Sequence, residues 1–228
     1  MFAIIDQRAP EEVKNNLKKY TETIFEFSTN GITSEAISGH PDIFIFQSET
    51  AFILAPNIPE SLVTFFEKAN VHFTYGTKPV GKNLDESVLY NAICTSDKLY
   101  GHTRKLDKSI LEHCANKKII HVNQAFTRCS MFVVKNRVIT SDKGIVKILK
   151  TKNIDYCYFD PSDIQIVGHK NGFIGGCMGQ MENKIFFMGN LLKHKDGGKL
   201  QDFLELLDFE VISLGHDYLY DGGGLFFM

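Results

Sequence analysis

Five loops of this 228-residue chain carry side chains that could do chemistry, and each loop lies just before an apolar run. These side chains belong to His40 and Asp42, to Tyr90 and Asn91, to Arg128, Cys129 and Ser130, to His169, Lys170 and Asn171, and to Asp221. A loop that only turned the chain would need nothing beyond Gly, Asn and Ser. Because His, Asp and Cys are present as well, the loops are candidates for one shared site.

Cys129 is the candidate nucleophile of this site. The thiolate is the reactive form of cysteine, and the neighbouring Arg128 would favour it. His40 could act as the general acid and base if it lies within hydrogen-bond reach of Cys129. Each residue also has a structural interpretation: a free cysteine is commonly a small buried hydrophobe, and His40 could cap the loop into its strand.

The predicted substrate-binding residues are Asp42, Asn91, Arg128 and Asp221. The carboxylates of Asp42 and Asp221 could hold a cationic group through charge-assisted hydrogen bonds. Asp221 could instead bond only the backbone of the glycine turn that follows it. The eight histidines form no HxxxH or HxH pair, so the spacing predicts no metal site, and we expect no cofactor.

The loops are positioned by elements that recur along the chain as a strand–strand–helix–strand unit. In each unit, two β-branched or aromatic runs flank a polar turn, and a helix with apolar residues at i, i+3 and i+4 follows, then another strand. The predicted hairpins span residues 42–55, 92–100, 130–140 and 173–188. The strands predicted after the helices span residues 71–75, 119–122, 156–159 and 211–214.

The N-terminal segment is a fifth unit that lacks one strand. Phe2–Ile5 is a predicted strand, Pro10 opens a helix, and Ile24–Phe27 is the next strand. The missing strand can be Leu225–Phe227, which would close a ring and leave no edge strands. An open α/β or α+β sheet is the alternative, but the hairpin–helix–strand order and the leftover final strand favour the ring.

The predicted fold class is therefore α/β, a five-bladed propeller of pseudo-fivefold ββαβ repeats, with the C-terminal strand paired to the N-terminal unit. We expect one domain over residues 1–228. Its units would cover residues 1–38 with 221–228, 39–80, 81–125, 126–168 and 169–220.

A ring of such units resembles the pentein fold of the guanidino-group-modifying enzymes, which include arginine deiminase, dimethylarginine dimethylaminohydrolase and the amidinotransferases. Gly39–Phe44 is similar to the family's His-x-Asp motif, which implies that His40 is the acid and base and that Asp42 holds the substrate guanidinium. Asp221–Phe227 resembles the glycine-rich entry to the family's last strand. The likeness covers the whole chain and is greatest to an uncharacterised bacterial family grouped with these enzymes.

One departure changes what the resemblance implies. These enzymes have a nucleophilic cysteine shortly after the C-terminal glycines, whereas this chain ends in Leu225-Phe226-Phe227-Met228. Cys129 could replace the lost nucleophile, because it lies two repeats from His40, as the family's cysteine does from its histidine. The sequence thus predicts a Cys-dependent hydrolase or transferase of guanidino or amidine compounds with a shifted nucleophile.

Two functions without chemistry are the alternatives. One is a non-catalytic binding or protein-interaction module, since the fold includes a ribosome-binding translation factor. The other is a binder of a small cationic metabolite that uses Asp42 and Asp221. Whether the chain is an enzyme, and whether it has a protein partner, is left open by the sequence.

The composition limits the partners and the cellular compartment that we expect. The net charge of −2 argues against a nucleic-acid or polybasic membrane partner. Five cysteines without a CxxC pair argue against a disulfide framework and for a reducing compartment. The N-terminus lacks the pattern of a signal peptide, and no apolar run approaches a membrane span, so we expect a cytoplasmic protein with a small guanidino or cationic ligand.

Overall fold

Each of the five sheets has three strands, and the middle strand is antiparallel to the inner strand and parallel to the outer one. The structure is a computed structural model that describes residues 1–29 and 31–228. The inner strands are β3 (Ile45–Gln47), β6 (Ile93–Cys94), β9 (Met131–Val134), β12 (Met178–Met181) and β15 (Phe226–Phe227). The middle strands are β1 (Phe2–Asp6), β4 (Phe52–Leu54), β7 (Lys98–Gly101), β10 (Arg137–Thr140) and β13 (Lys184–Phe187). The outer strands are β2 (Thr23–Phe27), β5 (Phe73–Tyr75), β8 (Lys118–His121), β11 (Tyr156–Tyr158) and β14 (Glu210–Ser213).

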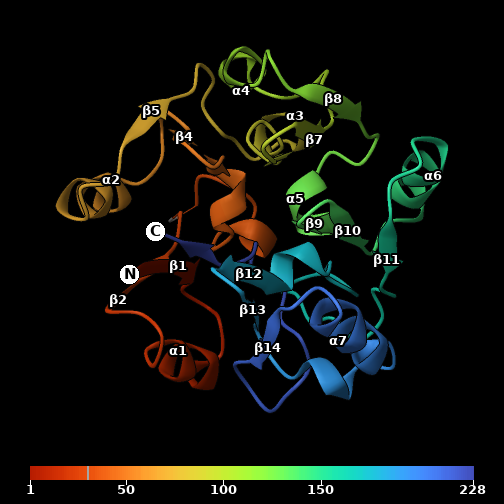
Figure 1. Cartoon of the computed structure of the whole chain (residues 1–228). Coiled ribbons are helices and arrows are strands. Elements are labelled where there is room, and N and C mark those ends of the chain that lie inside the picture. The colour runs from red at the N-terminus through yellow and green to blue at the C-terminus, as the bar shows by residue number, and fades with distance from the viewer. Residues whose placement is uncertain (30) are drawn as a thin grey trace.

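A helix connects the middle strand of each sheet to its outer strand, as a parallel connection requires. These helices are α1 (Glu11–Leu17), α2 (Glu60–Lys68), α4 (Lys108–His113), α6 (Lys143–Thr151) and α7 (Gly197–Glu205). Figure 1 shows the five sheets around a common centre, with the inner strands nearest to it and these helices on the outside.

The helices form where the sequence gives them an apolar face and a cap. In α6, Ile145 and Leu149 are one turn apart and buried, and the Asp142 carboxylate accepts the N–H of Ile145 at 2.7 Å. In α2, Leu62 and Phe66 have the same i, i+4 spacing and are fully buried. The core therefore lies between each sheet and its helix and continues inward between neighbouring sheets.

The predicted hairpins are confirmed, with one systematic difference at their starts. Short helical turns precede three of the inner strands: η2 (Pro41–Ile43), α5 (Thr127–Ser130) and η3 (Gly175–Cys177). The inner strands of the second and fifth units consequently begin later than the sequence predicted, at Ile45 and Met178. The other short helices are η1 (Glu35–Ile37), α3 (Leu84–Ser87) and η4 (Leu191–Lys193).

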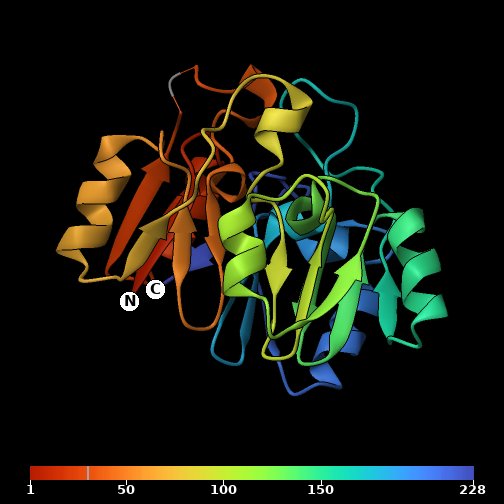
Figure 2. The ribbon, with the colours of Figure 1, turned by 90° about the horizontal axis from the view of Figure 1, so that it is seen from above.

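The C-terminal strand pairs with the N-terminal unit, as predicted. In β15, Phe227 is opposite Ala3 and Phe226 is opposite Ile4 of β1, in antiparallel register. The N–H of Phe2 donates to the carbonyl of Met228 at 2.9 Å, and the N–H of Met228 donates to the carbonyl of Phe2 at 3.0 Å. The two termini consequently lie side by side, as Figures 1 and 2 both show.

The described part of the chain holds no helix that is long and apolar enough to cross a membrane.

Replacing Phe226 by alanine tests how much the closing strand contributes to stability. Phe226 is fully buried, so its loss should leave a cavity and lower the free energy of unfolding by about 3–5 kcal/mol. Leu206→Ala is the control: Leu206 is 84% exposed, and its loss should cost no more than about 0.5 kcal/mol. Urea unfolding measures the loss of stability in both variants. Equal losses would contradict the role of Phe226 in holding the closing strand.

Candidate functional site

The starts of the inner strands meet at the centre of the molecule. Glycines make this close approach possible: a Cβ on Gly175 would lie 2.2 Å from the carbonyl oxygen of Arg128. A Cβ on Gly223 would lie 2.6 Å from the Cβ of His40, and Gly223 has a φ of +73°. The loops of different units are thus in direct contact, as a shared site requires.

Cys129 and Asp42, two units apart, form the central contact of this site. The thiol of Cys129 donates to Oδ2 of Asp42 across 2.7 Å. Asn91, from the unit between them, holds both partners. Its Oδ1 accepts the N–H of Arg128 at 2.6 Å and that of Cys129 at 3.4 Å. Its Nδ2 donates to the Asp42 carbonyl at 3.2 Å and lies 3.7 Å from the Cys129 sulfur.

His40 and Asp221 form the second half of the site. Nδ1 of His40 lies 4.0 Å from Oδ1 of Asp221. The Asp221 carboxylate also accepts the N–H groups of Phe173 at 2.8 Å and Gly223 at 3.1 Å. Asp221 therefore bonds the backbone of the glycine turn, which was the structural alternative for this residue. It also faces His40.

Both ring nitrogens of His40 and Oδ1 of Asp42 are buried at this centre and have no hydrogen-bond partner among the described residues. A buried polar group without a partner is costly, and native proteins rarely keep several together. The cost is offset if a ligand or water supplies the missing partners. This pattern is therefore typical of a binding site that is ready for a polar ligand.

A cavity of about 630 Å³ gives access to the site; we call it the axial pocket. His40, Cys129 and Asp221 line it, and Phe126 and Phe173 add apolar wall. The predicted loop residues His169, Lys170 and Asn171 also line it, together with Lys82. Cys129 is only 3% exposed, yet it borders this pocket, so it is buried without being sealed from a ligand.

Burial controls the ionisation of the site. It raises the pKa of the Cys129 thiol, and the nearby Asp42 and Asp221 carboxylates raise it further. It lowers the pKa of His40, which the Asp221 carboxylate only partly opposes. Burial also raises the pKa of Asp42, and it raises the pKa of Asp221 to about 6. Without a ligand, Cys129 is thus a thiol and His40 a neutral imidazole near pH 7.

Arg128 does not make Cys129 a thiolate by itself, contrary to the expectation from their adjacency. Its charge lowers the pKa of Cys129, but burial and the two carboxylates outweigh it. Its guanidinium donates to the carbonyls of Gly223 and Leu225, each at 3.3 Å, and lies 4.2 Å from the centre of the Phe226 ring. These contacts give Arg128 a role in positioning the closing strand.

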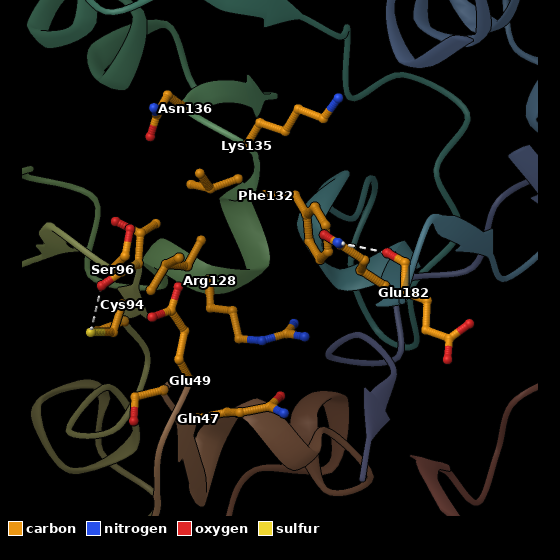
Figure 3. Close-up of a pocket in the computed structure, with 15 residues that line it drawn as sticks. Gln47, Glu49, Cys94, Ser96, Arg128, Phe132, Lys135, Asn136 and Glu182 are labelled. Atoms are coloured by element: carbon orange, nitrogen blue, oxygen red, sulfur yellow. Dashed lines mark hydrogen bonds between the residues drawn. The ribbon is translucent and has the colours of Figure 1, made fainter. Parts of the chain in front are cut away.

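The Arg128 side chain lines a second cavity, of about 630 Å³, which we call the hairpin-side pocket. Residues of four hairpins surround it, and Figure 3 shows Arg128 reaching into it among Gln47, Phe132 and Glu182. Arg128 was predicted to bind substrate beside Cys129. The structure places Cys129 on the axial pocket and the Arg128 guanidinium against the closing strand and the hairpin-side pocket.

The remaining sequence candidates at the centre are buried. The Tyr90 hydroxyl donates to the carbonyl of Lys78 at 2.7 Å, which is a structural contact. Ser130 is fully buried, and its hydroxyl has no partner in the described part of the chain. Cys177 is fully buried and donates to the carbonyl of Phe173 at 3.3 Å, in agreement with a packing role.

Among the described residues, one group could hold a metal ion, although the spacing along the sequence predicts none. His40, Asp42 and Cys129 each offer one ligand atom, and these atoms lie within 4.8 Å of one another. Imidazole, carboxylate and thiolate together suit Zn²⁺. Spacing along the sequence does not reveal this group, because the fold collects its members from two separate units.

Sequence reasoning missed Asp6 and its partners. Asp6 ends β1, is fully buried, and accepts from Arg8 at 2.9 Å and from the Tyr220 hydroxyl at 3.0 Å. Its charge and that of Arg8 act on His40 in opposite directions. An aspartate at the end of an apolar strand was the available signal, because a charge there needs a partner.

The chain is similar in structure to enzymes that act on guanidino compounds. A mutant of DDAH from Pseudomonas aeruginosa complexed with citrulline has 8% identity and a TM-score of 0.55, with 94% of this chain and 91% of that chain covered. Agmatine deiminase from C. jejuni has 9% identity and a TM-score of 0.59, with 94% and 87% covered. SxtG, an amidinotransferase from Microseira wollei in the saxitoxin biosynthetic pathway, has 9% identity and a TM-score of 0.56, with 94% and 88% covered.

The fold is accordingly that of the guanidino-group-modifying enzymes, the pentein fold, which confirms the predicted resemblance. No curated protein matches the sequence. The chain belongs to the family described as a family of unknown function (DUF6873), whose model matches residues 4–226.

Replacing Gly223 by alanine tests the contact between the loops. The residue has a φ of +73°, and the new Cβ would collide with the Cβ of His40 and with Oδ1 of Asp42. The free energy of unfolding should fall by about 1–3 kcal/mol. Gly198→Ala in α7 is the matched control: no atom lies within 4 Å of its Cβ, so unfolding should become harder by up to about 1 kcal/mol. Two losses of similar size would disprove the close approach.

Replacing Asp42 by asparagine tests the control of the Cys129 thiol. The Asp42 carboxylate raises the pKa of Cys129 more than any other charge does, so its removal should lower that pKa. More thiolate would form at neutral pH, and iodoacetamide should alkylate Cys129 about tenfold faster for each unit by which the pKa falls. Asp208→Asn, at a 94% exposed side chain, should leave the rate unchanged. Peptide mass spectrometry measures both rates, and slower alkylation in the Asp42 variant would refute the assigned role.

Proposed function

We propose that the protein is a Cys129-dependent hydrolase or transferase that acts on a guanidino or amidine group in the axial pocket. The observation that carries the proposal is the placement of His40, Asp42 and Cys129: their functional atoms lie within 4.8 Å of one another, and His40 and Cys129 line this pocket. A nucleophile, a group able to carry protons and a carboxylate are the parts that such a reaction needs. We further propose that the five units form one closed ring, which acts as a single domain.

The site suits a planar cation. Asp42 has an unpartnered Oδ1, and Oδ1 of Asp221 lies 4.0 Å from Nδ1 of His40. A guanidinium or amidinium offers several N–H donors in one plane, and carboxylates bind them by charge-assisted hydrogen bonds. The unpartnered nitrogens of His40 can face the same group. The ligand would therefore satisfy the buried atoms that the protein leaves without partners.

The cation would also activate Cys129. In the ligand-free site, two carboxylates hold the thiol in its protonated form. A positive charge beside Asp42 would offset those carboxylates and lower the pKa of Cys129. The thiol, which donates to Asp42 and makes no hydrogen bond to His40 in the empty site, would pass its proton to the neutral imidazole of His40 through a bound water or ligand group. Activation would thus depend on the substrate and would protect the thiol while the site is empty.

The proposed reaction has two steps, attack by Cys129 and then hydrolysis of the covalent intermediate. The Cys129 thiolate attacks the central carbon of the amidine group and forms a C–S bond, while one C–N bond breaks and the leaving amine takes a proton from His40. A water molecule next attacks the same carbon, gives a proton to His40, and releases the thiolate. The products of the cationic substrate and water are a protonated amine, which carries away the remaining proton, and a urea or amide. A second amine in place of water would make the reaction a transfer.

Binding without turnover is the second candidate function. It is favoured by the raised pKa of Cys129 and its 3% exposure, which describe an inert thiol as well as a protected one. The chain would then be a non-catalytic pentein that binds a small cationic metabolite or takes part in a protein interaction. Asp42 and Asp221 would keep their place as the cation-binding carboxylates.

Similarity in structure to proteins whose names include deiminase and amidinotransferase supports a guanidino ligand. The net charge of −2 and the five free cysteines support a small-molecule enzyme of the cytoplasm, with no nucleic-acid or membrane partner.

The test is turnover of a panel of guanidino acids, guanidino amines and amidines, followed by release of ammonia or amine. The native chain should convert at least one class, and Cys129→Ala should reduce the rate by at least about a thousandfold because the nucleophile is lost. Cys157→Ala is the matched control: Cys157 is a buried thiol in β11 that does not line the axial pocket, so its loss should leave the rate unchanged.

Calorimetry with the same panel separates the two candidate functions. Binding that is lost in Asp42→Asn, without product from the native chain, would refute the enzyme and favour the binding protein. Turnover that persists in Cys129→Ala would refute the assigned nucleophile.

A further inference from the structure

Two cysteines, Cys94 and Cys114, lie in contact away from the axial site. Cys94 is the last residue of β6, and Cys114 follows the end of α4. Their sulfur atoms are 3.5 Å apart, with Cys114 donating to Cys94. Both belong to the third repeat unit. A disulfide needs the two sulfur atoms to approach to about 2.05 Å, so a small shift would join them.

The two thiols have different surroundings. Cys94 is partly exposed and lines the hairpin-side pocket, where Figure 3 shows it beside Ser96. Cys114 is fully buried behind it. A small oxidant that entered the pocket would therefore meet Cys94 first, and Cys114 would be the next thiol in reach.

The charges around Cys94 favour its thiolate. The hydrogen bond from Cys114 lowers the pKa of Cys94, and the nearby Lys117 ammonium lowers it further, while burial and Glu49 act against them. Lys117 is held near this position because its ammonium donates to the carbonyl of Ser96. Reactive cysteines commonly occupy such partly exposed, electropositive positions.

We propose that Cys94 and Cys114 are a redox-active thiol pair that a hydroperoxide converts to a reversible intramolecular disulfide. The Cys94 thiolate attacks one peroxide oxygen, the O–O bond breaks, and an alcohol or water leaves after taking a proton. Cys94 is then a sulfenic acid. Cys114 attacks its sulfur, the S–S bond forms, and water leaves. Two thiols lose two electrons and two protons, and the peroxide gains them.

The other cysteines provide an internal comparison. Cys129 donates to a carboxylate, Cys177 donates to a backbone carbonyl, and Cys157 lies in β11, all three buried. Among the described residues, the only sulfur–sulfur hydrogen bond joins Cys94 and Cys114. The proposal is independent of the axial site and of its chemistry.

The consequence of the disulfide would reach a neighbouring unit. It would tie β6 to the end of α4, where His113 bonds the Ser48 hydroxyl at 3.1 Å and packs its ring against Phe46. Ser48 lies in the β3–β4 turn and, like Cys94, lines the hairpin-side pocket. Oxidation would thus act on the wall of this pocket.

The experiment oxidises the reduced full-length chain with stoichiometric hydrogen peroxide, alkylates the remaining thiols after unfolding, and maps the peptides by mass spectrometry. The expected product links the Cys94 and Cys114 peptides, leaves the other three cysteines alkylated, and reverts with dithiothreitol. In the native reduced protein, iodoacetamide should also alkylate Cys94 at least about tenfold faster than Cys157.

Two variants separate the role of Cys94, which the peroxide oxidises, from that of Cys114, which forms the disulfide. Cys114→Ser should leave Cys94 as a sulfenic acid that dimedone traps, and Cys94→Ser should leave Cys114 unoxidised. Cys157→Ser is the control and should form the disulfide as the native chain does. The proposal is overturned if the native chain accumulates Cys94 as sulfinic acid or free thiol, or if the disulfide joins a different pair. The native-chain result decides even where a variant does not fold.

Discussion

The antiparallel pairing of β15 with β1 is the interaction on which the centre of the molecule depends. It fixes the segment before β15, where Gly223 and Gly224 adopt the positive φ values that allow close packing on His40 and Arg128. The same segment carries Asp221, so the closing strand and one of the two carboxylates that raise the pKa of Cys129 are placed together. Arg128 secures the arrangement from the opposite side by holding the carbonyls of Gly223 and Leu225. The closing strand and part of the candidate site therefore share residues 221–228.

At the centre, hydrogen bonds and packing position the buried charged groups more than direct ion pairs do. Asp42 has a thiol and an amide nearby and no salt bridge within the described residues, and Arg128 has carbonyls and an aromatic ring. Buried charges that lack a direct counterion are expensive. They are tolerated here because the charges of Asp42 and Arg128 favour one another without direct contact, and because Asn91 bonds both neighbouring loops and keeps Asp42 and Cys129 in contact. The site is thus held in the arrangement that a cationic ligand would complete.

Most of the fold, and the meeting of the loops at one centre, could be predicted from the sequence. Period-2 and period-3.6 patterns are local, so the hairpins, the helices and the closing strand could be predicted from apolar spacing. Pseudo-symmetry then placed the loop starts at one centre, and His40, Asp42 and Cys129 do meet there. What failed was side-chain direction. Arg128 and Cys129 are adjacent in sequence but face different pockets, because α5 turns about 100° per residue.

Neither the ionisation of the site nor the Cys94–Cys114 contact could be predicted from the sequence. Arg128 beside Cys129 suggested a thiolate, but depth of burial decided the pKa, and burial is a property of the whole fold. The two thiols are 20 positions apart and in different elements, so only the packing of α4 on its sheet brings them together.

The position of α5 has one more consequence. This single turn of helix is the wall between two cavities, and consecutive residues of it line one cavity each. A displacement of α5 would therefore change the walls of both cavities at once. If binding in one cavity altered the affinity of the other, thermodynamic reciprocity would make the effect equal in both directions.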